Sequence, residues 1–354
     1  MNVRPIEGPA PVAMPKEFDT RRLVKRALQI MAVLLAVLLI GLLAPGLGEV
    51  RRRLSEAQPG WIVLAIALEA LSCLSYVLMF RPVFCRHMSR RSAWEIAWSE
   101  LGVGSIVPAS GAGGLALGAW VLRRGGMPAE KIARRSVAFF IIKSSVNFVA
   151  VVIVGTLMAL GLFGPHLSPW LTAFPALGAA VTIAVVVLVP RLGPGDGPAE
   201  NAGAVKRGLS ATRRALIGGT TEAMRIVRSG EWPVIFGAIG YWAFDNATLW
   251  ATFKAFGYSP NLAIILMGYL IGQLGGLLPL PGGLGGIDGG LIGTFVVYGT
   301  PVDVTVAAVL VYRVILFWLP LIVGAIAFWS LRKGLNDPER PDLCNVPEPA
   351  AAPA

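Results

Sequence analysis

Apolar residues gather in long runs along the chain, and six of these runs are long enough to cross a membrane as helices. A helix rises about 1.5 Å per residue, so roughly 20 apolar residues cross the ~30 Å hydrocarbon core of a bilayer. The pattern therefore predicts full-length spans at residues 26–44, 60–80, 135–162, 171–190, 232–256 and 304–331.

Two further apolar regions, 95–122 and 261–299, are broken near their centres by glycine and proline. The halves of the first region, on either side of Pro108, run about 12 or 13 residues and are too short to span. Basic residues flank this region on both sides, which predicts a hairpin that enters from the cytoplasm and returns there. The second region has flanks without basic residues and should enter from the opposite face, with a pair of tilted full spans as the alternative.

Composition agrees with a helical membrane protein. Only 14% of the 354 residues are charged, 55% are hydrophobic and the mean hydropathy is +0.68, whereas about a quarter of the residues of a soluble protein are charged. We expect an all-α polytopic protein with one membrane domain at 21–333. The polar ends, 1–20 and 334–354, should be disordered.

The formal net charge of +11 does not indicate nucleic-acid binding, because the Lys and Arg residues cluster beside alternate ends of the apolar runs. Three connections have none: Gly164–Trp170, Gly257–Asn261 and Gly299–Asp303. This positive-inside asymmetry predicts that both termini lie in the cytoplasm. The expected contacts are the anionic headgroups of lipids in the cytoplasmic membrane.

A polar linker at about 191–230 contains the stretch Gly203–Arg228, whose apolar residues fall mostly on one helical face. Leu209, Leu216 and Val227 belong to that face, and the basic residues lie mostly elsewhere. The stretch is typical of an amphipathic helix on the inner leaflet. A simple charged linker is an equally weighted alternative.

The two broken regions resemble each other. In 108–128 and again in 279–301, a proline is followed by a glycine three residues later, a glycine pair, an apolar half-helix and a closing proline. Each is preceded by a span and followed by a span with a cation, Lys143 or Arg313. Because the charged flanks are reversed, the pattern predicts two inverted units, as in many secondary transporters; chance similarity is the alternative. The predicted units are about 60–162 and 232–331.

Glycine and proline inside an apolar run leave backbone groups unpaired, which costs several kcal/mol for each group unless protein or water meets it. A broken helix is therefore expected only where it is buried or lines a cavity. Helices that begin after these prolines direct N–H groups inward, where they suit an anion such as a lipid phosphate. The candidate binding residues in the breaks are Pro108, Gly111, Gly113, Gly114, Pro279, Pro281, Gly282, Gly283, Gly285 and Gly286.

Ionisable residues inside spans are costly and by default mark a site. Arg313 lies at the centre of its run and needs a partner, for which Asp288 is the natural candidate; Lys143 could pair with Glu100. Ion pairs that only fix the packing are the alternative, and for Arg313 the two interpretations weigh equally. The deep charges assigned to substrate binding are Arg313, Asp288, Lys143, Glu100 and Asp245, with Glu69 as a weaker candidate.

No catalytic or metal-binding pattern accompanies these charges. The cysteines and histidines, Cys73, Cys85, Cys344, His87 and His166, lack the spacing of a disulfide framework or a zinc site. The serines in the apolar runs have no acid–base pair nearby in the sequence. We therefore expect no cofactor, no metal and no enzyme activity.

The same breaks resemble a known family. PLPGGLGGIDGG, the following GTP and the YR of VYRVILFWLP are similar to the second-half signature of the lysylphosphatidylglycerol synthase/flippase transmembrane family, and IVPASGAGG to RRGGMP resembles its first-half signature. The resemblance covers roughly Trp61–Leu331 and implies a lipid-translocating membrane domain. Lys143 stands where arginine is usual, Asp288 where glutamate is, and Gly113–Trp120 lacks a charge often found there, so no particular lipid is implied. The aminoacyl-transferase domain of the longer members is not in this sequence, so lipid modification is not expected.

These patterns favour a flippase-like transporter that binds an anionic or phosphate-bearing lipid between the two breaks. The alternative is a non-transporting accessory subunit or scaffold for a lipid-modifying or glycosyl-transferring enzyme, which would be its partner. An intramembrane enzyme is a weaker third hypothesis. The substrate, direction, energy source and oligomeric state do not follow from the sequence.

Overall fold

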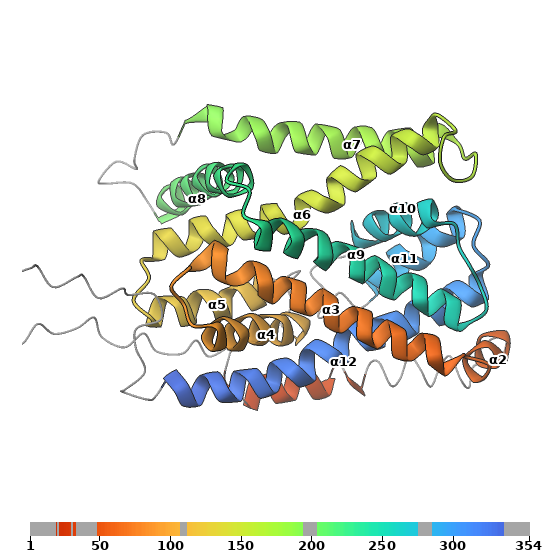
Figure 1. Ribbon diagram of the computed structural model, residues 1–354, viewed down its shortest axis with the longest axis horizontal. Coiled ribbons are helices and arrows are strands. Elements are labelled where there is room, and N and C mark those ends of the chain that lie inside the picture. Colours follow the sequence, from red (N-terminus) through yellow and green to blue (C-terminus); the bar gives the residue numbers. More distant parts are fainter. Residues whose placement is uncertain are drawn as a thin grey trace, which may run out of the picture.

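The computed structural model describes residues 19, 21–29, 31–32, 48–106, 112–193, 204–274 and 285–335, and all regular structure in these ranges is helical (Figure 1). The all-α fold is therefore confirmed. The helices are α2 (Gly48–Ser55), α3 (Pro59–Phe84), α4 (Arg90–Ile106), α5 (Ala112–Arg124), α6 (Ala129–Ala159), α7 (Pro169–Leu188), the 3-10 turn η2 (Val189–Leu192), α8 (Ala204–Arg228), α9 (Trp232–Ala255), α10 (Leu262–Gln273), α11 (Gly286–Val297) and α12 (Val302–Leu335).

Four helical stretches of the described chain are long and apolar enough to cross a bilayer: α3, α6, α7 with the turn after it, and α12. The predicted span at 232–256 is the 24-residue helix α9, whose apolar run contains Asp245. Most of the predicted span at 26–44 lies outside the described residues, and so do nearly all of the predicted disordered ends, 1–20 and 334–354. Residues 334 and 335 of the second end are the last residues of α12. The total number of spans thus stays a prediction.

Both broken regions form pairs of short helices. In the first, α4 has 17 residues and α5 has 13; in the second, α10 and α11 have 12 each. At 1.5 Å per residue these helices reach about 18–25 Å, less than the ~30 Å core. For the second region this length favours a re-entrant hairpin over two tilted spans. The two pairs lie toward opposite ends of the long helices, α4 and α5 on the left and α10 and α11 on the right (Figure 1).

The centre of the molecule is the packing of α3 against α9, which run side by side in opposite directions (Figure 1). The Ser72 hydroxyl donates to the Tyr241 carbonyl oxygen at 3.0 Å, and the Thr248 hydroxyl lies 3.5 Å from the Ala65 carbonyl oxygen. Gly237 lets the backbones approach, because a Cβ there would lie 2.8 Å from the Ser75 carbonyl oxygen. Small residues at a helix crossing are how membrane helices gain close contact.

Contacts between the first unit (α3–α6) and the second unit (α9–α12) are reciprocal. The first unit's α4 packs on α12, where a Cβ on Gly324 would lie 2.5 Å from the Trp98 carbonyl oxygen. The second unit's α10 packs on α6, where a Cβ on Gly155 would lie 3.3 Å from the Met267 methyl group. The first short helix of each unit, α4 or α10, thus packs on the last helix of the other unit, α12 or α6. Two inverted units require this reciprocal contact. This arrangement supports the inverted repeat, which stays a prediction.

The stretch predicted as an amphipathic helix forms α8, which favours that interpretation over the charged-linker alternative. One face of α8 packs on α6 and buries Ile217, Ala223 and Ile226, while Leu209 and Val227 remain exposed. Some of the apolar residues of α8 therefore pack against the protein, and others lie on its exposed surface. Residues 194–203 of the predicted linker lie outside the described residues.

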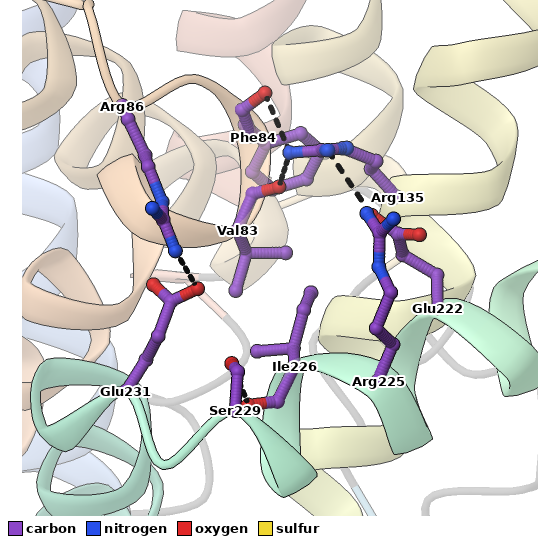
Figure 2. A network of polar contacts seen from close by, with 9 residues as sticks. All are labelled: Val83, Phe84, Arg86, Arg135, Glu222, Arg225, Ile226, Ser229 and Glu231. Carbon is purple, nitrogen blue, oxygen red and sulfur yellow. Dashed lines mark hydrogen bonds and ion pairs between the residues drawn. The ribbon is translucent and has the colours of Figure 1, made fainter.

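An ion pair joins α8 to the start of α6, and a hydrogen bond joins α6 to the end of α3 (Figure 2). The guanidinium of Arg135 donates to the Val83 carbonyl oxygen at 2.6 Å and pairs with Glu222 at 3.0 Å. Arg225 reaches the same carboxylate at 2.8 Å. Glu222 is buried, so these two arginines offset a carboxylate that would otherwise be costly to place there.

Candidate functional site

The deep charges predicted from the sequence come from six different helices and lie near one another. In addition to Asp288 beside Arg313, the charge of Lys143 interacts with those of Glu100 and Asp245. The charge of Asp245 also interacts with that of Arg313. Helices of both units therefore contribute to one polar centre, described below from the second unit to the first.

Arg313 lies inside α12, about a third of the way along, and forms an ion pair with Asp288 of α11, with Nε 2.7 Å from Oδ1. The predicted pairing is confirmed. The other carboxylate oxygen of Asp288 accepts the backbone N–H of Gly285 at 2.8 Å. Gly285 precedes the first residue of α11, Gly286, and has φ +80°, which favours glycine. One carboxylate oxygen of Asp288 therefore caps the N-terminus of its own helix, while the other neutralises the charge of Arg313.

Asp245 of α9 is buried and accepts two hydroxyl hydrogen bonds. Tyr312 donates to Oδ1 at 2.7 Å, and Tyr269 donates to Oδ2. Two phenol donors stabilise a carboxylate far better than an apolar helix surface would. Neither tyrosine was predicted, although Tyr312 directly precedes Arg313 and both lie inside apolar runs.

Lys143 does not form a direct ion pair with Glu100, so that predicted pairing is wrong. The phenol of Tyr76 lies between them: its hydroxyl donates to Glu100 Oε2 at 2.7 Å, and Lys143 Nζ lies 5.6 Å from the centre of its ring. Nζ also lies 5.3 Å from the ring of Tyr241 and 6.0 Å from that of Phe140. Aromatic faces attract a desolvated ammonium group, so three rings hold Lys143 in place of a carboxylate.

Glycine in α5 makes room for Glu100. A Cβ on Gly118 would lie 1.5 Å from Glu100 Oε1, and one on Gly114 would lie 2.2 Å from the Glu100 carbonyl oxygen. Gly113 lies beside Gly114 in the first turn of α5 and is also buried. Gly114 is thus a packing residue between α4 and α5, and Gly118, which the sequence interpretation missed, is a second. The signal was its spacing of four residues from Gly114 on one helical face.

The remaining predicted site residues are in the two breaks themselves. The second break stops where α11 begins at Gly286, and the first where α5 begins at Ala112. Six of the predicted residues lie outside the described part of the chain: Pro108, Gly111, Pro279, Pro281, Gly282 and Gly283.

Apolar helices around buried charges, with two pairs of short helices between them, define a multi-pass membrane protein. The pattern of the lysylphosphatidylglycerol synthase TM region matches residues 29–324, most of the chain. The chain belongs to this family, and the resemblance predicted from its motifs is confirmed.

Two of the curated relatives match this chain over most of their own length, and a third matches it over a shorter stretch. A UPF0104 membrane protein of Methanothermobacter thermautotrophicus is 28% identical over 337 residues, which cover 85% of this chain and 91% of that protein. A second UPF0104 membrane protein of the same organism is 26% identical over 305 residues, 80% of this chain and 88% of that protein. A UPF0104 membrane protein of Methanocaldococcus jannaschii is 30% identical over 103 residues, 29% of this chain and 31% of that protein.

Proposed function

We propose that the protein is a flippase-like transporter that moves an anionic or phosphate-bearing lipid across the cytoplasmic membrane, with both termini in the cytoplasm. The observation that carries this proposal is the placement of Arg313. Its guanidinium lies about a third of the way along a 34-residue apolar helix, 2.7 Å from a carboxylate in the first turn of a half-helix. A half-buried cation beside the start of a helix is a ready site for a phosphate.

Lys143 supports the same proposal from the other unit. It occupies the corresponding span, and within the described residues its ammonium group has aromatic faces around it in place of a carboxylate at ion-pair distance. A phosphate could approach this ammonium group without displacing an acid. Lys143 and Arg313 would then present two cations to one headgroup, each from one of the proposed inverted units.

Transport proceeds, in this proposal, by exposing the polar centre first to one leaflet and then to the other. The headgroup phosphate exchanges with Asp288 at Arg313, while the acyl chains stay in the lipid outside the bundle. Asp288 re-forms its ion pair after release, so the empty centre does not leave a buried charge unpaired. No covalent change of the lipid is needed, which agrees with a transporter rather than an enzyme.

The test is lipid movement by the purified full-length chain in vesicles. Fluorescent phosphatidylglycerol is placed in both leaflets, and a membrane-impermeant reductant bleaches the outer one. We expect bleaching to proceed beyond the outer-leaflet fraction, and faster than in protein-free vesicles. A rate equal to that of protein-free vesicles for this and for other labelled phospholipids would favour the accessory or scaffold role.

A further inference from the structure

Glu69 of α3 and Asp245 of α9 face each other across the central helix pair. The hydrogen bonds of Ser72 to Tyr241 and of Thr248 to Ala65 set an antiparallel register that brings these two residues to the same level, and their negative charges interact. Both side chains are 5% exposed. Two ionised carboxylates in one buried place repel each other, and a single shared proton removes that repulsion.

Hydrogen bonding distinguishes the two acids. Asp245 receives the hydroxyls of Tyr269 and Tyr312, which suit the ionised form. Glu69 receives at Oε1 only the weak S–H donor of Cys73, at 3.5 Å. Its Oε2 is buried and has no hydrogen-bond partner in the described part of the chain. Glu69 is therefore the acid of this pair on which a proton is held at least cost.

The charge balance of the whole centre also calls for protons. Within the described residues, the cations Lys143 and Arg313 stand against four carboxylates, those of Glu69, Glu100, Asp245 and Asp288. An anionic headgroup at the two cations would add further negative charge in a region where uncompensated charge is costly. Proton uptake would offset it without any rearrangement of the helices.

We propose that Glu69 and Asp245 form a proton-binding site that fills together with an anionic headgroup, so that lipid transport is coupled to protons. The coupling rests on the function proposed above. One proton from the aqueous phase binds Glu69 Oε2 and converts the carboxylate to the acid. It returns to water when the headgroup leaves. The two ligands bind cooperatively because each offsets the charge of the other.

Within the described part of the chain, the titratable groups that interact with Glu69 are Cys73 on α3 itself, Tyr241 and Asp245 on α9, Tyr269 on α10 and Tyr312 on α12, and none of them is a cation. The two cations of the centre, Lys143 on α6 and Arg313 on α12, interact with Asp245, and Glu100 on α4 interacts with Lys143 and Tyr76. Among these residue types, Asp and Glu are the ones that ordinarily exchange a proton with mildly acidic buffers.

The first experiment compares lipid movement in mildly acidic and mildly alkaline buffers, using fluorescent phosphatidylglycerol in vesicles with the full-length chain. Wild type should move the lipid about fivefold faster or more in acid, the lower end of ordinary coupling between two sites. Glu69→Gln mimics the protonated acid, and its rate should match in both buffers. Glu95→Gln is the matched control: this acid of α4 is equally buried but pairs with Arg91 and accepts the Ser330 hydroxyl. It should keep the wild-type response.

The second experiment observes the proton directly and does not need transport. Infrared difference spectra of the full-length protein, recorded between the two buffers, should show the carbonyl stretch of a protonated carboxyl in wild type, and Glu69→Gln should lack the part of that band that Glu69 contributes. That band without lipid movement at either pH would overturn the proposed function and leave the proton site standing. Lipid movement with no Glu69-dependent band, or with a response to sodium instead of protons, would overturn the proton site.

Discussion

Arg313 and Asp288 are the residues on which the proposed function depends most. Their ion pair is short, yet the two side chains are 12% and 20% exposed, so a ligand can reach them. Structural pairing and ligand binding therefore need not exclude each other. They differ in what happens when both charges are removed together.

We expect Arg313→Gln alone to lower the free energy of unfolding by about 3 kcal/mol, the lower end for a broken buried pair because both side chains keep some exposure. The double variant Arg313→Gln, Asp288→Asn should recover most of this stability, since no charge is left unpaired. Lipid movement should stay lost, because the phosphate has no guanidinium to bind. Thermal unfolding and the vesicle assay measure the two effects. A well-folded double variant with wild-type transport would show that the pair serves packing only.

At this scale the sequence predicts charges better than their neighbours. Arg313 and Asp288 could be paired in advance, because each is the charge in its own apolar run. The hydrogen bonds of Tyr269 and Tyr312 to Asp245 could not be predicted, because a Tyr in an apolar run suits a lipid-facing surface and a buried acid equally well. The error over Lys143 and Glu100 has the same origin. The Tyr76 ring that separates them comes from a third helix, and sequence spacing does not place it.

At the scale of helices, close packing of α4 and α5 depends on glycine. Gly118→Ala would place a Cβ 1.5 Å from Glu100 Oε1, so Glu100 must move or the helices must separate. We expect a loss of about 1–3 kcal/mol, as for other overpacked sites. Gly178→Ala in α7 is the control, because a Cβ there meets nothing within 4 Å, and it should be neutral or slightly stabilising.

A double-variant cycle shows whether the loss comes from Glu100 itself. Adding Glu100→Ala to Gly118→Ala removes the side chain that the new Cβ would meet, so the two effects should couple by more than about 0.5 kcal/mol. Chemical or thermal unfolding of each variant gives the four values required. Simple additivity would mean that α4 and α5 do not meet at this glycine.

The docking of α8 depends on Arg135. Its side chain is 18% exposed and pairs with a carboxylate that is 8% exposed, whereas Arg225 is 70% exposed. Arg135→Met should therefore release α8 and raise hydrogen exchange across 204–228 by about tenfold or more, the effect of roughly 1.4 kcal/mol or more. Arg225→Met should change it little, because an exposed ion pair contributes about 0–1 kcal/mol. Equal effects of the two variants would contradict this account of the docking.

The helices themselves followed from the sequence more readily than their contacts. Proline and glycine in the middle of an apolar run indicate a break in the helix. Both pairs of short helices could therefore be located from the sequence. Which apolar residues of α8 pack on α6 and which lie on the exposed surface could not be predicted. A period of 3.6 residues marks an apolar face, but it does not say whether protein or lipid covers it.

At the scale of the whole molecule, the proposed inversion of the two units explains why the pairs of short helices lie toward opposite ends (Figure 1). Charge at the flanks is the basis of this prediction, and the reciprocal contacts of α4 with α12 and α10 with α6 support it. Membrane orientation is a property of the inserted protein, so chemical labelling in intact cells is the appropriate measurement.

We expect single cysteines at exposed positions on the two hairpin flanks to react from opposite sides. In a chain without its native cysteines, His87→Cys and Glu130→Cys flank the first hairpin, and both should be protected from an impermeant thiol reagent in whole cells until the membrane is opened. Ser259→Cys and Val302→Cys flank the second hairpin and should react at once. All four positions are exposed in the fold, so protection reports the membrane and not burial. Labelling of His87→Cys and Glu130→Cys on opposite sides would mean that the first pair of helices crosses the membrane, and the inverted repeat would then be wrong.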